Sequence, residues 1–165
     1  RLIYLICGED SEKTKELMEE LKTTGKYTIT PEMKEKLADF AAGYSTEEET
    51  AESIHDTYQK TGYVMDTHTA VAAHVCGQYR AKSGDQTKCV IASTASPYKF
   101  VKSVMSAIDA ENANADEFDL LPKLQEVSGV PMPQAIKDIL DAKVLHDLEC
   151  DADKMKDTVK GILGV

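Results

Sequence analysis

Residues 63–108 decide the expected fold, and they read YVMDTHTAVAAHVCGQYRAKSGDQTKCVIASTASPYKFVKSVMSAI. The apolar run at 63–65 is typical of a short strand, and it ends in a polar turn. A helical pattern follows over residues 69–81, because apolar or aromatic side chains recur there at every fourth position. This order predicts a strand followed by a helix.

The same order of elements repeats in the second half of the stretch. The apolar run 89–92 predicts another strand, and a further helix is predicted to end at Ile108. A strand–helix–strand unit crosses over right-handed into a parallel pair. The expected fold class is therefore α/β, a predominantly helical chain with a small parallel βαβ unit at 63–109. Residues 1–62 and 110–165 are expected to be helical, as a shell packed on this unit within a single domain.

Capping signals predict the helices before the central stretch. An amphipathic helix is expected from Asp10 to about Thr24, where glycine follows. The sequence Thr-Pro-Glu at 30–32 is typical of a helix start. Ser45 and Glu48 fit a capping box, which predicts the start of the next helix.

The carboxy-terminal third predicts shorter elements. Helices are expected at 120–128 and 135–140, and an amphipathic edge strand at 143–148. Asp151 or Asp153 is expected to cap a last helix whose inward side chains include Met155, Val159, Ile162 and Leu163.

Composition limits the possible partners. The chain has 165 residues, which suffices for one domain with a core. Its formal net charge of -10, from 29 acidic and 19 basic residues, argues against nucleic acid or an anionic membrane as a partner. No apolar run approaches the roughly 20 residues that a spanning helix needs, and no signal-peptide pattern is present. We therefore expect a cytoplasmic protein.

The sequence predicts no metal site. The four cysteines are scattered along the chain: Cys7, Cys76, Cys89 and Cys150. They lack the short spacings of a zinc site or a disulfide framework, so free thiols in a reducing cytosol are expected. His68 and His74 are six positions apart, which separates them by about 240° around a helix. They therefore do not share a face from which to bind one metal ion.

Two polar turns are the candidate functional site. In the expected sheet, the turns at 66–69 and 93–96 follow neighbouring parallel strands, so they would lie on one rim, where ligands of such sheets bind. Each turn also precedes a helix, whose N-terminal N–H groups and dipole favour an anion. A phosphate-bearing ligand is therefore the first hypothesis.

Each candidate residue also has a simpler structural interpretation. His68 fits a general acid or base, a phosphate donor, or a histidine satisfied by its own turn. Asp66 fits a helix cap, the commonest use of aspartate at such a position. Ser93 and Thr94 fit contacts to a ring nitrogen or a phosphate, or turn hydroxyls bonded to nearby backbone. These alternatives stay open on the residues alone.

The two turns resemble a known family. Asp-Thr-His-Thr-Ala-Val at 66–71, followed by Ser-Thr-Ala-Ser-Pro-Tyr-Lys-Phe at 93–100, resembles the carboxy-terminal part of threonine synthases. The sequence departs from the family pattern at Thr67, where proline is frequent, and at Ser96, where many members have histidine. Two motifs in the right order and at the right separation make the resemblance specific.

The resemblance implies a pyridoxal-phosphate enzyme of the tryptophan-synthase-β-like fold. Such a lyase converts O-phospho-L-homoserine and water to L-threonine and phosphate. It implies that Thr94, with Ser93 beside it, lies against the pyridine nitrogen of the cofactor. It also implies that Asp66, His68 and Thr69 lie at the rim of the active site.

One family feature is absent from the sequence. The Schiff-base lysine of the family lies in a Ser-Phe-Lys-Asp-like motif, and no such motif occurs here. The chain is therefore expected to be a carboxy-terminal fragment, inactive alone, whose partner is the amino-terminal remainder of the same protein. The alternative is a free-standing acidic α/β module that binds a partner or a small phosphate ligand.

Overall fold

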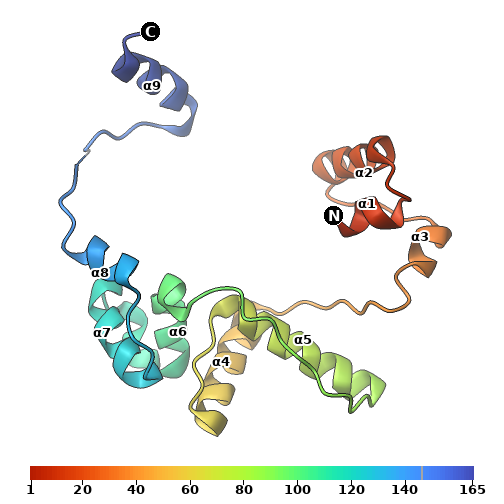
Figure 1. Cartoon of the computed structure of the whole chain (residues 1–165), viewed down its shortest axis with the longest axis horizontal. Helices are drawn as coiled ribbons and strands as arrows, with labels where there is room; N and C mark the ends of the chain where they lie inside the picture. Colours follow the sequence, from red (N-terminus) through yellow and green to blue (C-terminus); the bar gives the residue numbers. More distant parts are fainter. Residues whose placement is uncertain (146) are drawn as a thin grey trace.

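The computed structural model describes residues 1–145 and 147–165, and every regular element in them is helical (Figure 1). The α-helices, and the 3-10 helices marked η, are α1 (Leu2–Ile6), α2 (Ser11–Thr24), α3 (Pro31–Glu35), α4 (Glu47–Thr61), α5 (Thr67–Ser83), η1 (Pro97–Phe100), α6 (Val101–Ile108), η2 (Ala110–Asn114), α7 (Glu117–Ser128), α8 (Gln134–Leu140), η3 (Ala152–Lys154) and α9 (Met155–Leu163). None of these helices combines the length and the apolar character that crossing a membrane requires.

The predicted α/β class is wrong, because the described residues contain no β-strand and the fold is all-α. A strand exists only where a second backbone segment pairs with it. Residues 63–65 instead form a connector whose Val64 and Met65 are buried among helices. Residues 89–92 run beside α5 without strand pairing, and the Val90 side chain is 92% exposed (Figure 1). Both segments are apolar in sequence, but neither has a strand partner among the described residues.

A central body of helices contains the main core. α4 packs against α5 and α6, and α6 packs against η2 and α7. The buried side chains of this core are Ile54, Val64, Met65, Ala70, Tyr98, Val101, Val104, Met105, Leu120, Leu121, Leu124 and Met132. A separate small core of Ile6, Leu17 and Met33 holds the first three helices together.

Of the ranges expected to form a shell, α4 and α7 pack in the central body, whereas the two ends of the chain lie apart from it. Figure 1 shows α1–α3 and α9 apart from the central helices, each at the end of a long connecting segment. α9 contains no buried residue, and its predicted inward side chains are all exposed. The strand predicted at 143–148 is absent at 143–145 and 147–148, while position 146 lies outside the described residues.

Local capping signals predicted the starts of α2 and α3 but not that of α9, where neither Asp151 nor Asp153 makes a side-chain capping hydrogen bond. Asp10 caps α2, Thr30 caps α3, and Gly62 closes α4 in the left-handed conformation. The capping box of α4 is one position later than predicted. Thr46 accepts from the Glu49 N–H, and the Glu49 carboxylate accepts from the Thr46 N–H.

Tyr98 anchors the second polar turn to the core. Its side chain is 3% exposed, and its hydroxyl donates to the Val130 carbonyl at 2.6 Å. Burial raises the pKa of the Tyr98 hydroxyl above its ordinary value, against a smaller lowering by the Ser128 hydroxyl. This contact ties the motif at 93–100 to the end of α7.

Candidate functional site

Asp66 organises the start of α5. Its side chain is 1% exposed and accepts from the backbone N–H groups of His68, at 2.9 Å, and Thr69, at 3.3 Å. The Thr69 hydroxyl donates to the other carboxylate oxygen. Asp66 is therefore a helix cap, as the simpler interpretation held. Because its carboxylate occupies these N–H groups, they are not free to bind a phosphate.

The two polar turns meet through their hydroxyl groups. The Thr69 and Ser93 side-chain oxygens lie 3.1 Å apart. A hydroxyl holds one proton and a carboxylate can only accept, so Thr69 donates to Asp66 and accepts from Ser93. The two turns thus lie together, as expected. Hydrogen bonds between their side chains hold them there, however, and not the ends of neighbouring strands.

Thr94 is the residue of this turn whose hydroxyl has no hydrogen-bond partner within the described chain. Its side chain is exposed, and within the described chain it makes no hydrogen bond, whereas the Ser93 hydroxyl is used toward Thr69. The residue that follows an anchored serine is therefore held near α5 with its polar group toward solvent. A neutral hydroxyl in this setting fits an aromatic ring nitrogen, which needs only one hydrogen bond.

His68 lies at the edge of the same site. Its side chain is 62% exposed, with Nδ1 3.6 Å from the nearer Asp66 oxygen. Its ring centroid lies 5.0 Å from that of Phe100, at an interplanar angle of 41°. The Lys99 ammonium lies 5.4 Å from the same phenyl centroid. His68 and Lys99 are therefore brought to one aromatic ring.

A polar hollow of about 360 Å³ opens beside His68. Its walls come from the starts of α4 and α5 and from α6, and are lined by Ser45, Glu47, Thr50, Thr67, His68, Val71, Phe100 and Ser103. The lining residues from α4 and α6 were not predicted from the sequence. They are separated along the chain from the two motifs, and a lone serine or threonine carries no sequence signal.

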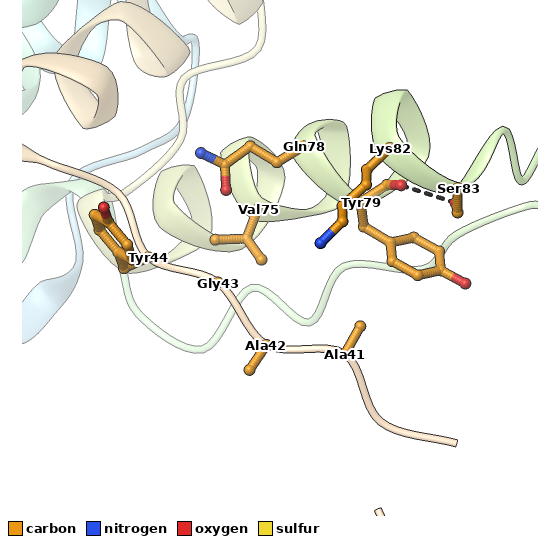
Figure 2. A pocket seen from close by; sticks show the side chains of 9 residues that line it. All are labelled: Ala41, Ala42, Gly43, Tyr44, Val75, Gln78, Tyr79, Lys82 and Ser83. Atoms are coloured by element: carbon orange, nitrogen blue, oxygen red, sulfur yellow. Dashed lines mark hydrogen bonds between the residues drawn. The ribbon is translucent and has the colours of Figure 1, made fainter. Parts of the chain in front are cut away.

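A second hollow of about 590 Å³ lies along the later half of α5 (Figure 2). Figure 2 shows the segment at 41–44 crossing α5 opposite Val75 and Tyr79. A Cβ atom at Gly43 would lie 2.9 Å from a Val75 methyl group, so the crossing requires glycine for space. This mainly apolar hollow holds none of the predicted site residues.

The described residues contain no cluster of three metal-ligating side chains. His74 instead lies 3.6 Å from a Glu49 carboxylate oxygen, and its Nε2 is 2.9 Å from the Gln78 amide nitrogen. His68 and His74 thus face different partners, in agreement with their spacing around the helix.

Residues 69–159, more than half of the 165, match the family described as threonine synthase, C-terminal. The chain therefore belongs to the threonine synthase carboxy-terminal family, as the two motifs indicated.

Individual relatives are named threonine synthase or threonine synthase-like 1. The chain is 32% identical over 129 residues to threonine synthase of Saccharomyces cerevisiae, covering 73% of this chain and 25% of that protein. It is 32% identical over 152 residues to threonine synthase of Schizosaccharomyces pombe, covering 85% and 30%. It is 30% identical over 132 residues to threonine synthase-like 1 of Homo sapiens, covering 79% and 17%. The chain thus spans between 17% and 30% of the length of these relatives.

Proposed function

We propose that this chain is the carboxy-terminal part of a pyridoxal-phosphate-dependent threonine synthase, a lyase that converts O-phospho-L-homoserine and water to L-threonine and phosphate. Membership of the family supports the proposal. The observation that carries the site is the hydrogen-bond chain from Asp66 through Thr69 to Ser93, because it joins the two family motifs in one place.

Within this proposal, Thr94 is the cofactor contact. When bound, pyridoxal phosphate supplies the electron sink for the reaction, and the protein orients it. Asp66 holds Thr69, Thr69 holds Ser93, and the neighbouring Thr94 is left free to hydrogen-bond the pyridine nitrogen. A neutral hydroxyl satisfies that nitrogen without placing a negative charge beside it.

Within the same proposal, His68 and the polar hollow form part of the substrate-binding region. The hollow carries hydroxyl groups and the Glu47 carboxylate beside an exposed histidine, so it offers hydrogen bonds and a partner for the ammonium group of an amino-acid substrate. We propose that His68, held against Phe100, lies at the rim where substrate enters.

Exposed apolar surface favours this proposal over a free-standing binding module. Leu145, Leu148, Ile162 and Leu163 are each more than 60% exposed. A closed module rarely leaves so many large apolar side chains in water. The rest of a larger enzyme would cover them.

The test is made in the complete enzyme that includes this chain. Thr94→Val is expected to lower kcat/KM by about 10- to 100-fold, the effect of losing one hydrogen bond. Its effect on the absorption band of the bound cofactor is the second measurement. Thr94→Ser is expected to retain most activity, and Thr23→Val, on exposed α2, is the matched control. Equal activity of Thr94→Val and the control would overturn the role of Thr94.

The isolated chain provides a second test. Without a Schiff-base lysine motif, it is expected to give no turnover of O-phospho-L-homoserine and no specific borohydride trapping of pyridoxal phosphate. Trapping on one particular lysine of this chain would contradict the proposal that the nucleophile lies elsewhere.

A further inference from the structure

The segment after α5 returns along that helix in the opposite direction (Figure 1). Near the end of α5, the Arg80 guanidinium donates to the Thr87 carbonyl at 2.6 Å. At the start of α5, the Thr69 and Ser93 hydroxyl oxygens are 3.1 Å apart. These two contacts fix how residues 87–93 align with residues 69–80.

Between the two contacts, the alignment places Cys89 opposite Cys76. Cys76 lies four helical residues before Arg80, about 6 Å along the axis at about 1.5 Å per residue. Cys89 lies two extended residues after Thr87, also about 6–7 Å at about 3.3 Å per residue. Both cysteines are therefore the same distance from the Arg80–Thr87 contact.

Cys76 also points toward the returning segment. It is seven positions after Thr69 and four before Arg80, so the three side chains lie on one face of α5, within about 40° of each other. Two of these side chains contact the returning segment directly. The third faces it at the level of Cys89.

The raised pKa of the Cys76 thiol agrees with this placement. The nearby Cys89 side chain, and less strongly burial, raise the pKa of the Cys76 thiol above its ordinary value, and Arg80 opposes the rise. Cys76 is partly buried and Cys89 is exposed. The Cys89 sulfur is therefore the one that an oxidant in solution meets first.

We propose that Cys76 and Cys89 form a redox-responsive thiol pair, which a small disulfide such as glutathione disulfide converts to an intramolecular disulfide. The Cys89 thiolate attacks one sulfur of the small disulfide, breaking its S–S bond and releasing one small thiol. The Cys76 thiolate then attacks the Cys89 sulfur and releases the second small thiol. The protein loses two protons and two electrons, and the oxidant is reduced to two thiols.

The disulfide would pin the returning segment to α5 at its middle. That segment carries Ser93 and Thr94 to the start of α5, so oxidation would restrain the polar turn that contacts Thr69. Cys7 and Cys150 are natural controls. Cys7 lies in the separate small core, and Cys150 is in the exposed carboxy-terminal segment.

The experiment treats the chain with glutathione disulfide at low protein concentration and digests it with trypsin under non-reducing conditions. Oxidation is expected to link the tryptic peptides 61–80 and 89–99 with the loss of two hydrogens, reversed by dithiothreitol. Cys7→Ser with Cys150→Ser is expected to leave this linkage unchanged.

Single variants separate the two thiols. In Cys76→Ser, the glutathione adduct on Cys89 is expected to accumulate at least about tenfold over the wild type, where the intramolecular thiol removes it. Cys89→Ser changes an exposed side chain, so this variant is expected to fold even if the Cys76 variant does not. It is expected to lose the linkage between peptides 61–80 and 89–99. An adduct that persists on wild-type Cys89, or linkage of Cys76 to Cys150 at an equal rate, would overturn the proposal. Neither readout involves cofactor or substrate, so the result is independent of the proposed function.

Discussion

The central helices and α9 have similar amphipathic sequences but opposite environments. Leu120 and Leu124 of α7 are completely buried, whereas Ile162 and Leu163 of α9 are 64% and 68% exposed. Both helices place apolar side chains at helical spacing. The difference teaches that an apolar stripe predicts a helix and a need for cover, but not whether the cover belongs to the same chain.

Removing a buried leucine is the strongest test of this comparison. Leu124→Ala is expected to lower the free energy of unfolding by about 2–5 kcal/mol, because the central body closes around this side chain. Urea unfolding followed by far-UV circular dichroism measures the loss. Leu148→Ala, at an exposed leucine, is the control. Equal losses for both variants would mean that the central core is not the stabilising unit.

Removing the buried cap of α5 is expected to have the second-largest effect on the free energy of unfolding. Asp66→Ala should cost about 2 kcal/mol, because two N–H groups and the Thr69 hydroxyl lose their acceptor in a buried setting. Asp10→Ala removes an exposed cap that accepts from the Lys13 N–H, so about 1 kcal/mol or less is expected. Thermal or urea unfolding compares the two. A larger loss for Asp10→Ala would contradict the central role of Asp66.

The capping box of α4 gives a smaller effect. Thr46→Ala is expected to cost about 1 kcal/mol, since the Glu49 N–H loses its side-chain acceptor. Ser45→Ala should stay within about 0.5 kcal/mol, because Ser45 is not the cap. Urea midpoints of the two variants decide between them. A larger effect at Ser45 would favour the box predicted from sequence.

Acid should weaken the same box. The Thr46 N–H, and less strongly His74, holds the pKa of Glu49 below its ordinary 4.5. A lowered folded-state pKa stabilises the fold above the unfolded value, and this contribution is lost as pH falls through the folded value. Wild-type stability should therefore fall more steeply than that of Glu49→Gln as pH is lowered below about 4.5. Urea midpoints over an acid series measure this, with Glu48→Gln as control; equal slopes for wild type and Glu49→Gln would contradict it.

The smallest effect is expected in α9. Ile162→Ala should change the free energy of unfolding of the isolated chain by less than about 0.5 kcal/mol, because this side chain is 64% exposed on a helix without buried residues. The same urea titration measures it. A loss of more than 1 kcal/mol would show that α9 docks on the central body in solution and would remove the contrast.

Local structure was predictable from the sequence because its signals act within one helical turn. Asp10, Thr30 and Asp66 each occupy the predicted cap or start. The box of α4 was misplaced by one residue because Ser45 with Glu48 and Thr46 with Glu49 fit the same pattern. Sequence alone gives no reason to choose between them.

Long-range structure was predicted less well. The strand expected at 89–92 has the right composition, but a strand is a property of two segments, and the described residues supply no partner. The two polar turns were expected to meet at the ends of neighbouring parallel strands, and these strands do not occur in the described residues. Their meeting depends on the contact between Thr69 and Ser93, which no local pattern encodes. The roles of Thr94 and His68 in a cofactor or substrate site stay predictions.

The buried Tyr98 gives the molecule an optical reporter of its own. The chain has no tryptophan and seven tyrosines, so its near-ultraviolet absorption is that of tyrosine. Because burial raises the pKa of the Tyr98 hydroxyl, its phenolate band should emerge after those of the exposed tyrosines in an alkaline titration. The pH at which this late band appears would report, without any added label, whether the contact between the second family motif and the end of α7 is intact.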